Sequence, residues 1–222
     1  VGLSYQYDAA GREIRNSFID KDGNPIDSVS GYCSEKRAYD ANGNVIEIRY
    51  ENSRGELVRN IDEVAIERRE YDVAGRVIST KSFDPTDSLS PSRDGYAEAR
   101  SAYDDNGFLA SESFFDARGN AAYAPAGYHR AQYVRDNTGF AIRTEFFGAD
   151  GSPVFSRDGF ARSDVVLSDE GRTFDVSYFG PDGAPALSAN GWARVKVITD
   201  SRGKMIETRG LNADGELEIG VE

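Results

Sequence analysis

The sequence has few of the residues that carry covalent or redox chemistry: its 222 residues include one cysteine, one histidine, one tryptophan and one methionine. A single cysteine, Cys33, excludes a disulfide within the chain, so backbone pairing and packing have to supply the stability. Alanine takes the equivalent place elsewhere in the chain, at Ala65, Ala97, Ala161 and Ala193. We therefore expect a small, partly buried side chain at Cys33 rather than a reactive thiol.

Long apolar runs and basic clusters are also missing. No stretch approaches the roughly 20 apolar residues needed to cross a bilayer, and no charged-then-apolar signal segment opens the chain. The net charge of -12 disfavours a phosphate-binding surface, which needs clustered lysine and arginine. The sequence thus predicts no membrane insertion and no nucleic-acid partner, and an export signal would have to lie outside it.

What the chain does have is a strict 32-residue repeat, marked by Gly11, Gly43, Gly75, Gly107, Gly139, Gly171 and Gly203. This period predicts seven copies of one small unit, each stabilised by its neighbours. We expect residues 1–222 to form a single repeat domain of seven units. Val1 aligns with Cys33, and Glu222 falls just before the next expected glycine. This phase indicates a fragment of a larger protein, with oligomeric state unknown.

Two turns recur in each unit. The first has aspartate three residues before the repeat glycine, as in Asp8 to Gly11, and such an aspartate bonds the backbone amide two residues on. Only the sixth copy shifts, with Ser168 at the aspartate position and Asp169 one residue later. The second turn is marked by Gly23, Gly55, Gly119, Gly151, Gly183 and Gly215, with Asp87 as the one substitution. Proline at positions 25, 153 and 185 predicts a short or edge strand after it, so each unit should hold two long strands and one short one.

Alternation in the strand after the first turn predicts one dry and one wet face. The dry face carries the Ile14 and Phe18 positions and their equivalents, and the wet face carries the Arg15 position. A second aromatic position follows a further glycine: Tyr32, Tyr96, Tyr128, Phe160 and Trp192. We favour a core ladder of these rings between sheets. The third copy departs with Glu63 and Val64, and we expect a local distortion between residues 60 and 92.

These patterns predict an all-β fold of seven antiparallel hairpin units in an elongated, twisted array. A closed seven-unit, propeller-like ring is the alternative, although 32 residues is short for the four-stranded blade of a propeller.

Tyrosine precedes the turn aspartate at Tyr7, Tyr39, Tyr71 and Tyr103. This Tyr-Asp-x-x-Gly pattern resembles the tyrosine-aspartate (YD, Rhs-type) repeats of bacterial proteins. The resemblance implies hairpin arrays in exported, surface or toxin-delivery proteins, some with carbohydrate binding. Two features differ: the unit is longer, at 32 residues, and the tyrosine position holds Arg135, Leu167 and Thr199 in the last copies.

The sequence predicts no enzyme and no cofactor. His129 takes the Cys33 position without a recognisable triad pattern, and most aspartates belong to turns. A weaker alternative is a calcium loop at Asp20, Asp22, Asn24 and Asp27, because Ca²⁺ takes closely spaced carboxylate and carbonyl oxygens. Other copies place arginine among these positions, as in Arg54 and Arg118, so turn formation is the favoured interpretation.

We therefore expect a non-enzymatic, extracytoplasmic binding, adhesion or display module with a glycan or protein partner. The alternative is a structural spacer or shell segment of a larger secreted toxin or sensor protein. If aromatic rings bind a ligand, Trp192 and Tyr128 are the candidates, with His129 beside them. A binding face should expose a contiguous apolar patch, whereas a spacer should be polar throughout.

Overall fold

The computed structural model describes residues 1–168, 172–212 and 217–218, and every regular element in them is a β-strand. The strands, in chain order, are β1 (Gly2–Tyr7), β2 (Glu13–Ile19), β3 (Ser34–Tyr39), β4 (Val45–Glu51), β5 (Ile66–Tyr71), β6 (Val77–Phe83), β7 (Glu98–Tyr103), β8 (Leu109–Phe115), β9 (Arg130–Arg135), β10 (Ala141–Phe147), β11 (Arg162–Ser168), β12 (Thr173–Phe179), β13 (Arg194–Thr199), β14 (Met205–Leu211) and β15 (Leu217–Glu218). No helix long and apolar enough to cross a membrane occurs in this described part.

The strands belong to one sheet in which neighbours in sequence are neighbours in space, from β1 to β15. The pairs are antiparallel, which confirms the predicted all-β array of hairpin units. The closed ring is wrong, because β1 and β15 stand at opposite ends of the strand order. This order follows from the short connections, since consecutive antiparallel strands can be joined by tight turns.

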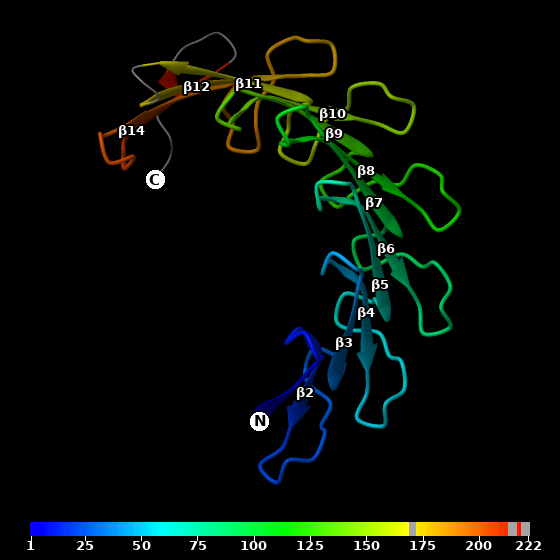
Figure 1. The fold of residues 1–222 in the computed structure, drawn as a ribbon. Helices are drawn as coiled ribbons and strands as arrows, with labels where there is room; N and C mark the ends of the chain where they lie inside the picture. The colour runs from blue at the N-terminus through cyan, green and yellow to red at the C-terminus, as the bar shows by residue number, and fades with distance from the viewer. Residues whose placement is uncertain (169–171, 213–216, 219–222) are drawn as a thin grey trace. The chain divides into compact units, whose positions relative to one another are not determined.

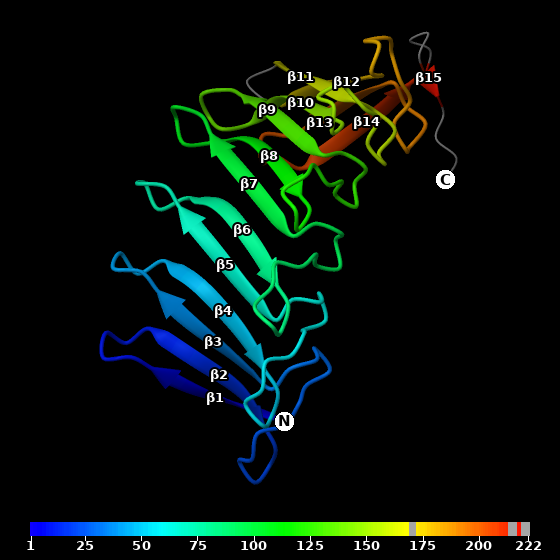
Figure 2. The same cartoon turned by 90° about the vertical axis from the view of Figure 1, so that its right-hand side faces the viewer.

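Two compact units divide the chain. Unit 1 comprises residues 1–101 with 114–122, and unit 2 comprises residues 102–113 with 123–222. Within unit 1, β1 to β6 lie side by side in chain order (Figure 1). Within unit 2, β9 to β14 do the same (Figure 2). Both units are built from the same repeat, and the expectation of a single repeat domain over residues 1–222 stays a prediction.

The first turn has the predicted aspartate geometry. The carboxylate of Asp8 accepts hydrogen bonds from the backbone N–H groups of Ala10 and Arg12, each at 2.9 Å. Gly11 donates its N–H to the Asp8 carbonyl at 3.0 Å and has a φ of 78°. The hydrogen bond from the Arg12 amide is the main cause of the lowered pKa of Asp8. The same carboxylate bond to the amide two residues on recurs at Asp40, Asp72, Asp104, Asp136 and Asp200.

Most hairpins close with a register shift next to the turn, as between Ala38 and Tyr39 in the β3–β4 pair. The shift is the bulge expected when a glycine with positive φ ends the turn. The β11–β12 pair keeps one register from Arg162 to Ser168, in agreement with the shifted sixth copy. Asp169 and Gly171 of that copy lie outside the described residues.

The second turn leads into a strand reduced to a single bridge. Gly23 donates its N–H to the Asp20 carbonyl at 3.2 Å, and the chain then pairs once with the preceding strand, Ile19 with Pro25. Equivalent bridges are Glu51 with Leu57, Phe83 with Leu89, Phe115 with Ala121, Phe147 with Pro153 and Phe179 with Pro185. The predicted short strand is therefore present in minimal form; Gly215, the last glycine of this series, lies outside the described residues.

A third turn, which we did not predict, completes the repeat. Gly31 donates its N–H to the Ser28 carbonyl at 3.1 Å, and Ser28 donates its own N–H to the Tyr32 carbonyl at 2.9 Å. Serine opens this turn again at Ser92, Ser156 and Ser188. The recurring Ser-x-x-Gly spacing was the available signal, and serine hydroxyls form such turns as aspartate does, though more weakly.

The expected distortion between residues 60 and 92 is wrong. Glu63 donates its N–H to the Asn60 carbonyl at 2.9 Å, and Asp87 donates to Asp84 at 3.1 Å. Both turns therefore keep the geometry of the glycine copies, with φ of 64° at Glu63 and 63° at Asp87. A left-handed backbone costs a non-glycine residue roughly 1–2 kcal/mol, and neighbouring repeats that share the same turn hold it in place.

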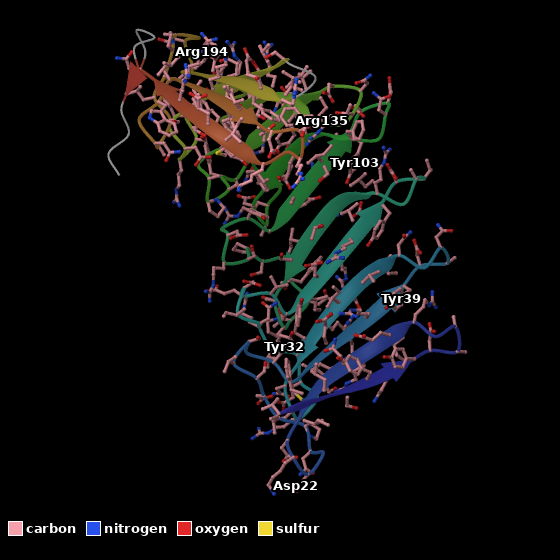
Figure 3. All side chains as sticks on the ribbon, turned by 90° about the vertical axis from the view of Figure 1, so that its left-hand side faces the viewer. Asp22, Tyr32, Tyr39, Tyr103, Arg135 and Arg194 are labelled. Atoms are coloured by element: carbon pink, nitrogen blue, oxygen red, sulfur yellow. The ribbon has the colours of Figure 1, made fainter. Side chains whose placement is uncertain are left out.

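Aromatic rings form the predicted ladder, but on one face of a single sheet rather than between two sheets. Tyr32 contacts Phe18 and Tyr50, with ring centroids 5.8 and 4.9 Å apart (Figure 3). In unit 2, Phe160 contacts Phe146 and Tyr178 at 5.6 and 4.7 Å. Small side chains are buried beside these rings: Cys33, Ala65, Ala97, Ala161 and Ala193. The prediction of a buried, small side chain at Cys33 is confirmed.

The division into a dry and a wet face holds only in part. On the face expected to be dry, Ile46 and Ile206 are exposed, because one sheet has no second layer to cover them. On the other face Ser79 is buried, and arginine guanidinium groups stack on phenylalanine rings at 4.0 to 4.5 Å. The four stacked pairs are Arg68 on Phe83, Arg100 on Phe115, Arg130 on Phe147 and Arg162 on Phe179.

Candidate functional site

The two rings that the sequence nominated for ligand binding take part in the ladder. Tyr128 stacks on Phe146 with centroids 4.5 Å apart and an angle of 19° between the ring planes. Trp192 lies directly against Gly210, where an added Cβ would overlap the indole. Each ring is half-buried and uses one face for packing. A binding role for these rings stays a prediction, and it would have to use the remaining face or edge.

His129 occupies the same position as Cys33, as expected from the repeat. Its backbone N–H donates to the Phe147 carbonyl at 2.9 Å, and its side chain is half-buried. The imidazole thus replaces a methyl or thiol beside the aromatic ladder. Its part in binding also stays a prediction.

The segment considered as a calcium loop uses its oxygens for turn and inter-repeat hydrogen bonds. The Asp20 carboxylate accepts from the backbone N–H groups of Asp22 and Asn24, at 2.8 and 2.9 Å. The Asp27 carboxylate accepts from the Ser53 N–H in the next repeat at 2.6 Å. Among the described residues, no three His, Cys, Asp or Glu side chains gather in a group that could hold a metal ion. Turn and inter-repeat hydrogen bonds thus engage the Asp20 and Asp27 carboxylates, and a calcium role for the segment stays a prediction.

A position between the second and third turns distinguishes the two units; we call it the rim position, and it holds Asp27, Arg59, Pro91, Tyr123, Phe155 and Leu187. In unit 1 its side chains tie adjacent repeats together. Asp27 bonds Ser53, and the Arg59 guanidinium donates to the Glu63 carbonyl and to the Ser90 hydroxyl. Two of the three rim residues of unit 1 are thus polar and bonded to the next repeat, and the third is Pro91.

In unit 2 the rim position is apolar and exposed. Tyr123, Phe155 and Leu187 show 49%, 54% and 51% of their surface to solvent. Because each is one repeat from the next, and strands lie about 4.8 Å apart, successive side chains fall roughly 10 Å apart along this edge of unit 2. The structure therefore presents a row of large apolar groups on turns that are otherwise polar.

Glycine in the second turn makes room for these rings. The turn opens with Asp20, Asn52, Asp84 and Asp116 in unit 1, but with Gly148 and Gly180 in unit 2. A Cβ at Gly148 would lie 3.0 Å from the Tyr123 hydroxyl oxygen, and one at Gly180 would lie 3.2 Å from the Phe155 ring. The Ala149 N–H also donates to the Tyr123 hydroxyl at 3.2 Å. The rings are therefore seated on the next repeat and not simply free in solvent.

Tyr39 and Tyr71, beside their first turns, clamp the preceding hairpin. We call this place in the repeat the clamp position; it holds Tyr7, Tyr39, Tyr71, Tyr103, Arg135, Leu167 and Thr199. The Tyr39 hydroxyl donates to the Glu13 carbonyl at 2.6 Å, and Tyr71 donates to Val45 at 2.7 Å. In unit 2, Nε of Arg135 donates to the Leu109 carbonyl, which is the equivalent acceptor, at 2.9 Å (Figure 3). Arginine therefore replaces tyrosine here without loss of the inter-repeat bond.

Comparison with known proteins gives distant matches only. No protein-family model matches the chain, and no curated protein matches it. It is similar to the crystal structure of TcdB2-TccC3-TEV, with a TM-score of 0.41 and 14% identity over 90% of this chain and 10% of that one. A Photorhabdus luminescens Tc holotoxin pore gives 0.34 and 14% identity over 97% of this chain and 14% of the other.

The chain thus spans 10% to 14% of the length of these toxin components. At this distance the matches do not reveal what the chain binds. The antiparallel hairpin repeats seen in the sheet agree with the hairpin arrays that the Tyr-Asp-x-x-Gly resemblance implies.

Proposed function

We propose that this chain is a non-enzymatic binding module that acts outside the cytoplasm, and that the rim of unit 2 is its binding surface for a protein partner. The observation that carries the proposal is the row of exposed Tyr123, Phe155 and Leu187. Large exposed apolar side chains in one row favour an interaction site, because leaving them in water gives up about 25 cal/mol for each Å² that a partner would cover.

The side chains favour a protein over a glycan. Tyrosine and phenylalanine rings can stack on sugars, but Leu187 offers no flat face for stacking, whereas a phenol, a phenyl ring and an isobutyl group together suit the apolar anchors of a protein interface. The net charge of -12 supports a partner with a neutral or basic rim. The extracytoplasmic location rests on the Tyr-Asp-x-x-Gly resemblance.

A display library of random peptides, selected on the whole chain, tests the surface. We expect the selected peptides to lose about tenfold or more in affinity, or at least 1.4 kcal/mol, when Tyr123, Phe155 and Leu187 are all replaced by serine. The matched control replaces three exposed apolar residues of unit 1 by serine: Val29, Ile61 and Val73.

Peptides that bind the triple rim variant as tightly as the native chain would contradict the proposal. Peptides that lose affinity for the control variant, and not for the triple rim variant, would also contradict the proposal. If the native chain binds to a glycan array and the triple rim variant does not, the partner is a glycan and not a protein.

A structural spacer is the second candidate function, and unit 1 supports it. Asp27 and Arg59 use the rim position to connect one repeat to the next, and a repeat array is stabilised by such nearest-neighbour contacts. A spacer predicts that neither peptides nor glycans bind the chain.

A further inference from the structure

Two opposite charges face each other across β10 and β11 in unit 2, yet they do not pair with each other. Glu145 and Arg162 are directly opposite in the register of these strands. The guanidinium group of Arg162 instead lies over the ring of Phe179, 4.1 Å from its centroid. Phe179 is the register partner of Arg162 on β12, the strand on the other side of β11. This stacking holds the positive charge away from Glu145.

Both side chains have unused hydrogen-bonding capacity. Nε of Arg162 is buried without a hydrogen-bond partner; it lies 3.4 Å from the Asp164 carboxylate, which accepts two hydrogen bonds from Arg143. Over residues 1–168, 172–212 and 217–218, neither the terminal nitrogens of Arg162 nor the Glu145 carboxylate form a hydrogen bond. Unused donors and an unused acceptor at half-buried positions point to a bound group.

A pocket of about 70 Å³ adjoins both side chains. Its lining includes Glu145, Arg162, Phe147, Pro153, Gly180 and Pro181. Since a water molecule takes about 30 Å³, the pocket has room for one terminal group of a few non-hydrogen atoms. It offers such a group a carboxylate, a guanidinium group and apolar walls.

The equivalent charges in unit 1 are satisfied within the chain. Lys81 and Glu98 occupy the repeat positions of Glu145 and Arg162 with the charges reversed, and they are directly opposite in the β6–β7 register. Their charged atoms are 3.8 Å apart, and Glu98 also accepts hydrogen bonds from Ser79 and Arg100. The unpaired charges beside the pocket are therefore a feature of unit 2 and not of the repeat.

The pocket adjoins the rim. Gly180 lines the pocket, and an added Cβ at Gly180 would lie 3.2 Å from the ring of Phe155, the middle rim residue of unit 2. Pro153, another lining residue, is two residues before Phe155. A partner that covers Phe155 can therefore place one of its side chains in the pocket.

We propose that this pocket binds the primary carboxamide of an asparagine or glutamine side chain of the protein partner that covers the rim. The amide oxygen accepts a hydrogen bond from the Arg162 guanidinium group, and the amide nitrogen donates one to the Glu145 carboxylate. This assignment rests on the proposed function of the rim, and it names the group that the partner presents beside its apolar contacts.

The two charges favour an amide over other terminal groups. A primary amide has one acceptor oxygen and two N–H donors, so it meets both Arg162 and Glu145. A carboxylate only accepts hydrogen bonds and is repelled by Glu145, whereas an ammonium group only donates and is repelled by Arg162. An apolar group would leave both charges without a hydrogen bond.

NMR titrations of the whole chain with propanamide, the side-chain analogue of glutamine, test the pocket without a partner. In two-dimensional ¹H–¹⁵N spectra we expect saturable shifts at the backbone amides of Arg162, Gly180 and Gly183. Propanoate and propylamine, which have a similar size, should each bind about tenfold or more weakly. The absence of saturable shifts with propanamide would overturn the proposal, as would equally tight binding of propanoate or propylamine.

Two variants test the assigned contacts. Glu145→Ser and Arg162→Ser should each lower the propanamide affinity about tenfold or more, because each removes a charged hydrogen-bond partner. Serine occurs at these repeat positions as Ser177 and Ser34, so we expect both variants to fold. Lys81→Ser changes the equivalent position of unit 1 and is the matched control, with unchanged affinity. Unchanged affinity in either folded pocket variant would overturn the contacts.

Peptides selected on the whole chain separate this proposal from the function of the rim. We expect an asparagine or glutamine at a fixed distance from their apolar residues, and its replacement by aspartate or glutamate should lower the affinity about tenfold or more. Peptides that depend on Tyr123, Phe155 and Leu187 but tolerate this replacement would overturn the carboxamide assignment and leave the rim as a binding surface. Propanamide binding without any rim-dependent peptide would refute the function of the rim, and with it the partner as the source of the amide.

Discussion

Units 1 and 2 are built from the same repeat but place different residues at two equivalent positions. At the rim position unit 1 places Asp27 and Arg59, which bond to the following repeat, and unit 2 places Tyr123, Phe155 and Leu187, which face solvent. At the clamp position unit 1 has Tyr39 and Tyr71, each bonded to the preceding hairpin, whereas unit 2 has Arg135, which keeps this bond, and Leu167, whose side chain has no hydrogen to donate. In unit 1 these positions join repeats; in unit 2 the rim position faces solvent instead, and the clamp is kept at Arg135.

The comparison shows that the hairpin framework tolerates different residues at the rim and clamp positions, because hydrogen bonds within the turns hold the hairpins together. Asp40 in unit 1 and Asp136 in unit 2 each hold their turn through a carboxylate bond to the amide two residues on. An inter-repeat hydrogen bond contributes about 1 kcal/mol, and in a repeat array the stability is spread over many such contacts. A residue that bonds to a neighbouring repeat can therefore be replaced by one that faces solvent without loss of the fold.

The largest expected effect distinguishes two equivalent glycines of the third turn. Gly159 in unit 2 has a φ of 87°, and an added Cβ would lie 2.6 Å from the Leu187 carbonyl oxygen. Gly159→Ala should lower the free energy of unfolding by about 3 kcal/mol or more, since strain and a backbone clash add up. Gly95 in unit 1 has a φ of 88° and open space around its Cβ position. Gly95→Ala should cost only about 1 kcal/mol, and equal urea midpoints for the two variants would show that the close contact at Leu187 is unimportant.

Substitutions at the clamp position should change the free energy of unfolding in opposite directions in the two units. Tyr71→Phe removes a hydroxyl bonded to the Val45 carbonyl, and should lower the free energy of unfolding by about 1 kcal/mol. Leu167→Tyr supplies the missing donor and should raise it by a similar amount. Urea unfolding of both variants checks the pair. A destabilised Leu167→Tyr would mean that the β10–β11 junction cannot adopt the clamped geometry of unit 1.

The smallest effect concerns two glutamates and depends on pH. In unit 1, hydrogen bonds from Arg100 chiefly lower the pKa of Glu98. In unit 2, burial raises the pKa of Glu112. At pH 7 the ionised Glu98 favours the folded state and the ionised Glu112 opposes it. Glu98→Gln should therefore lower the melting temperature at pH 7, and Glu112→Gln should raise it.

The pH dependence of these two variants gives the control. A lowered folded pKa contributes stability that is present above the ordinary value of 4.5 and is lost as the pH falls through the folded pKa. A raised folded pKa contributes stability that is present below 4.5 and is lost as the pH rises through the folded pKa. Glu112→Gln should thus match native stability once the pH is below 4.5, and the deficit of Glu98→Gln should shrink as the pH falls below 4.5 through the folded pKa of Glu98. A Glu112→Gln variant that is less stable than the native chain at pH 7 would contradict the burial of this carboxylate.

The sequence was sufficient for the hairpin framework because the turns are local. Aspartate and glycine at fixed spacing define the first turn regardless of what packs around it, and the alternating aromatic positions predicted the ladder. The third turn was missed because its serine opener has a weaker preference for turns than aspartate. Glu63 and Asp87 were misjudged because a single non-glycine residue can be held at positive φ by a framework that its own sequence does not reveal.

The candidate surfaces depend on contacts between repeats, which a single sequence does not display. Tyr123 and Phe155 could have been aligned with Asp27, but their packing against the next repeat depends on the space left by Gly148 and Gly180. The substitution at Leu167 was visible in the sequence, whereas the acceptors of the Tyr39 and Tyr71 hydroxyls, 26 residues earlier in the chain, required the structure. Conversely, the nominated rings of Tyr128 and Trp192 proved to pack against neighbouring strands.

Hydroxyl-radical footprinting of the whole chain tests the central contrast most directly. We predict that the rings of Tyr123 and Phe155 are oxidised at rates close to that of the exposed Tyr7, while Phe114 and Phe146, which are 4% and 7% exposed, are protected. Protection of Phe155 to the level of Phe146 in the isolated chain would contradict the account, because the rim of unit 2 would then be part of the core rather than a surface for a partner.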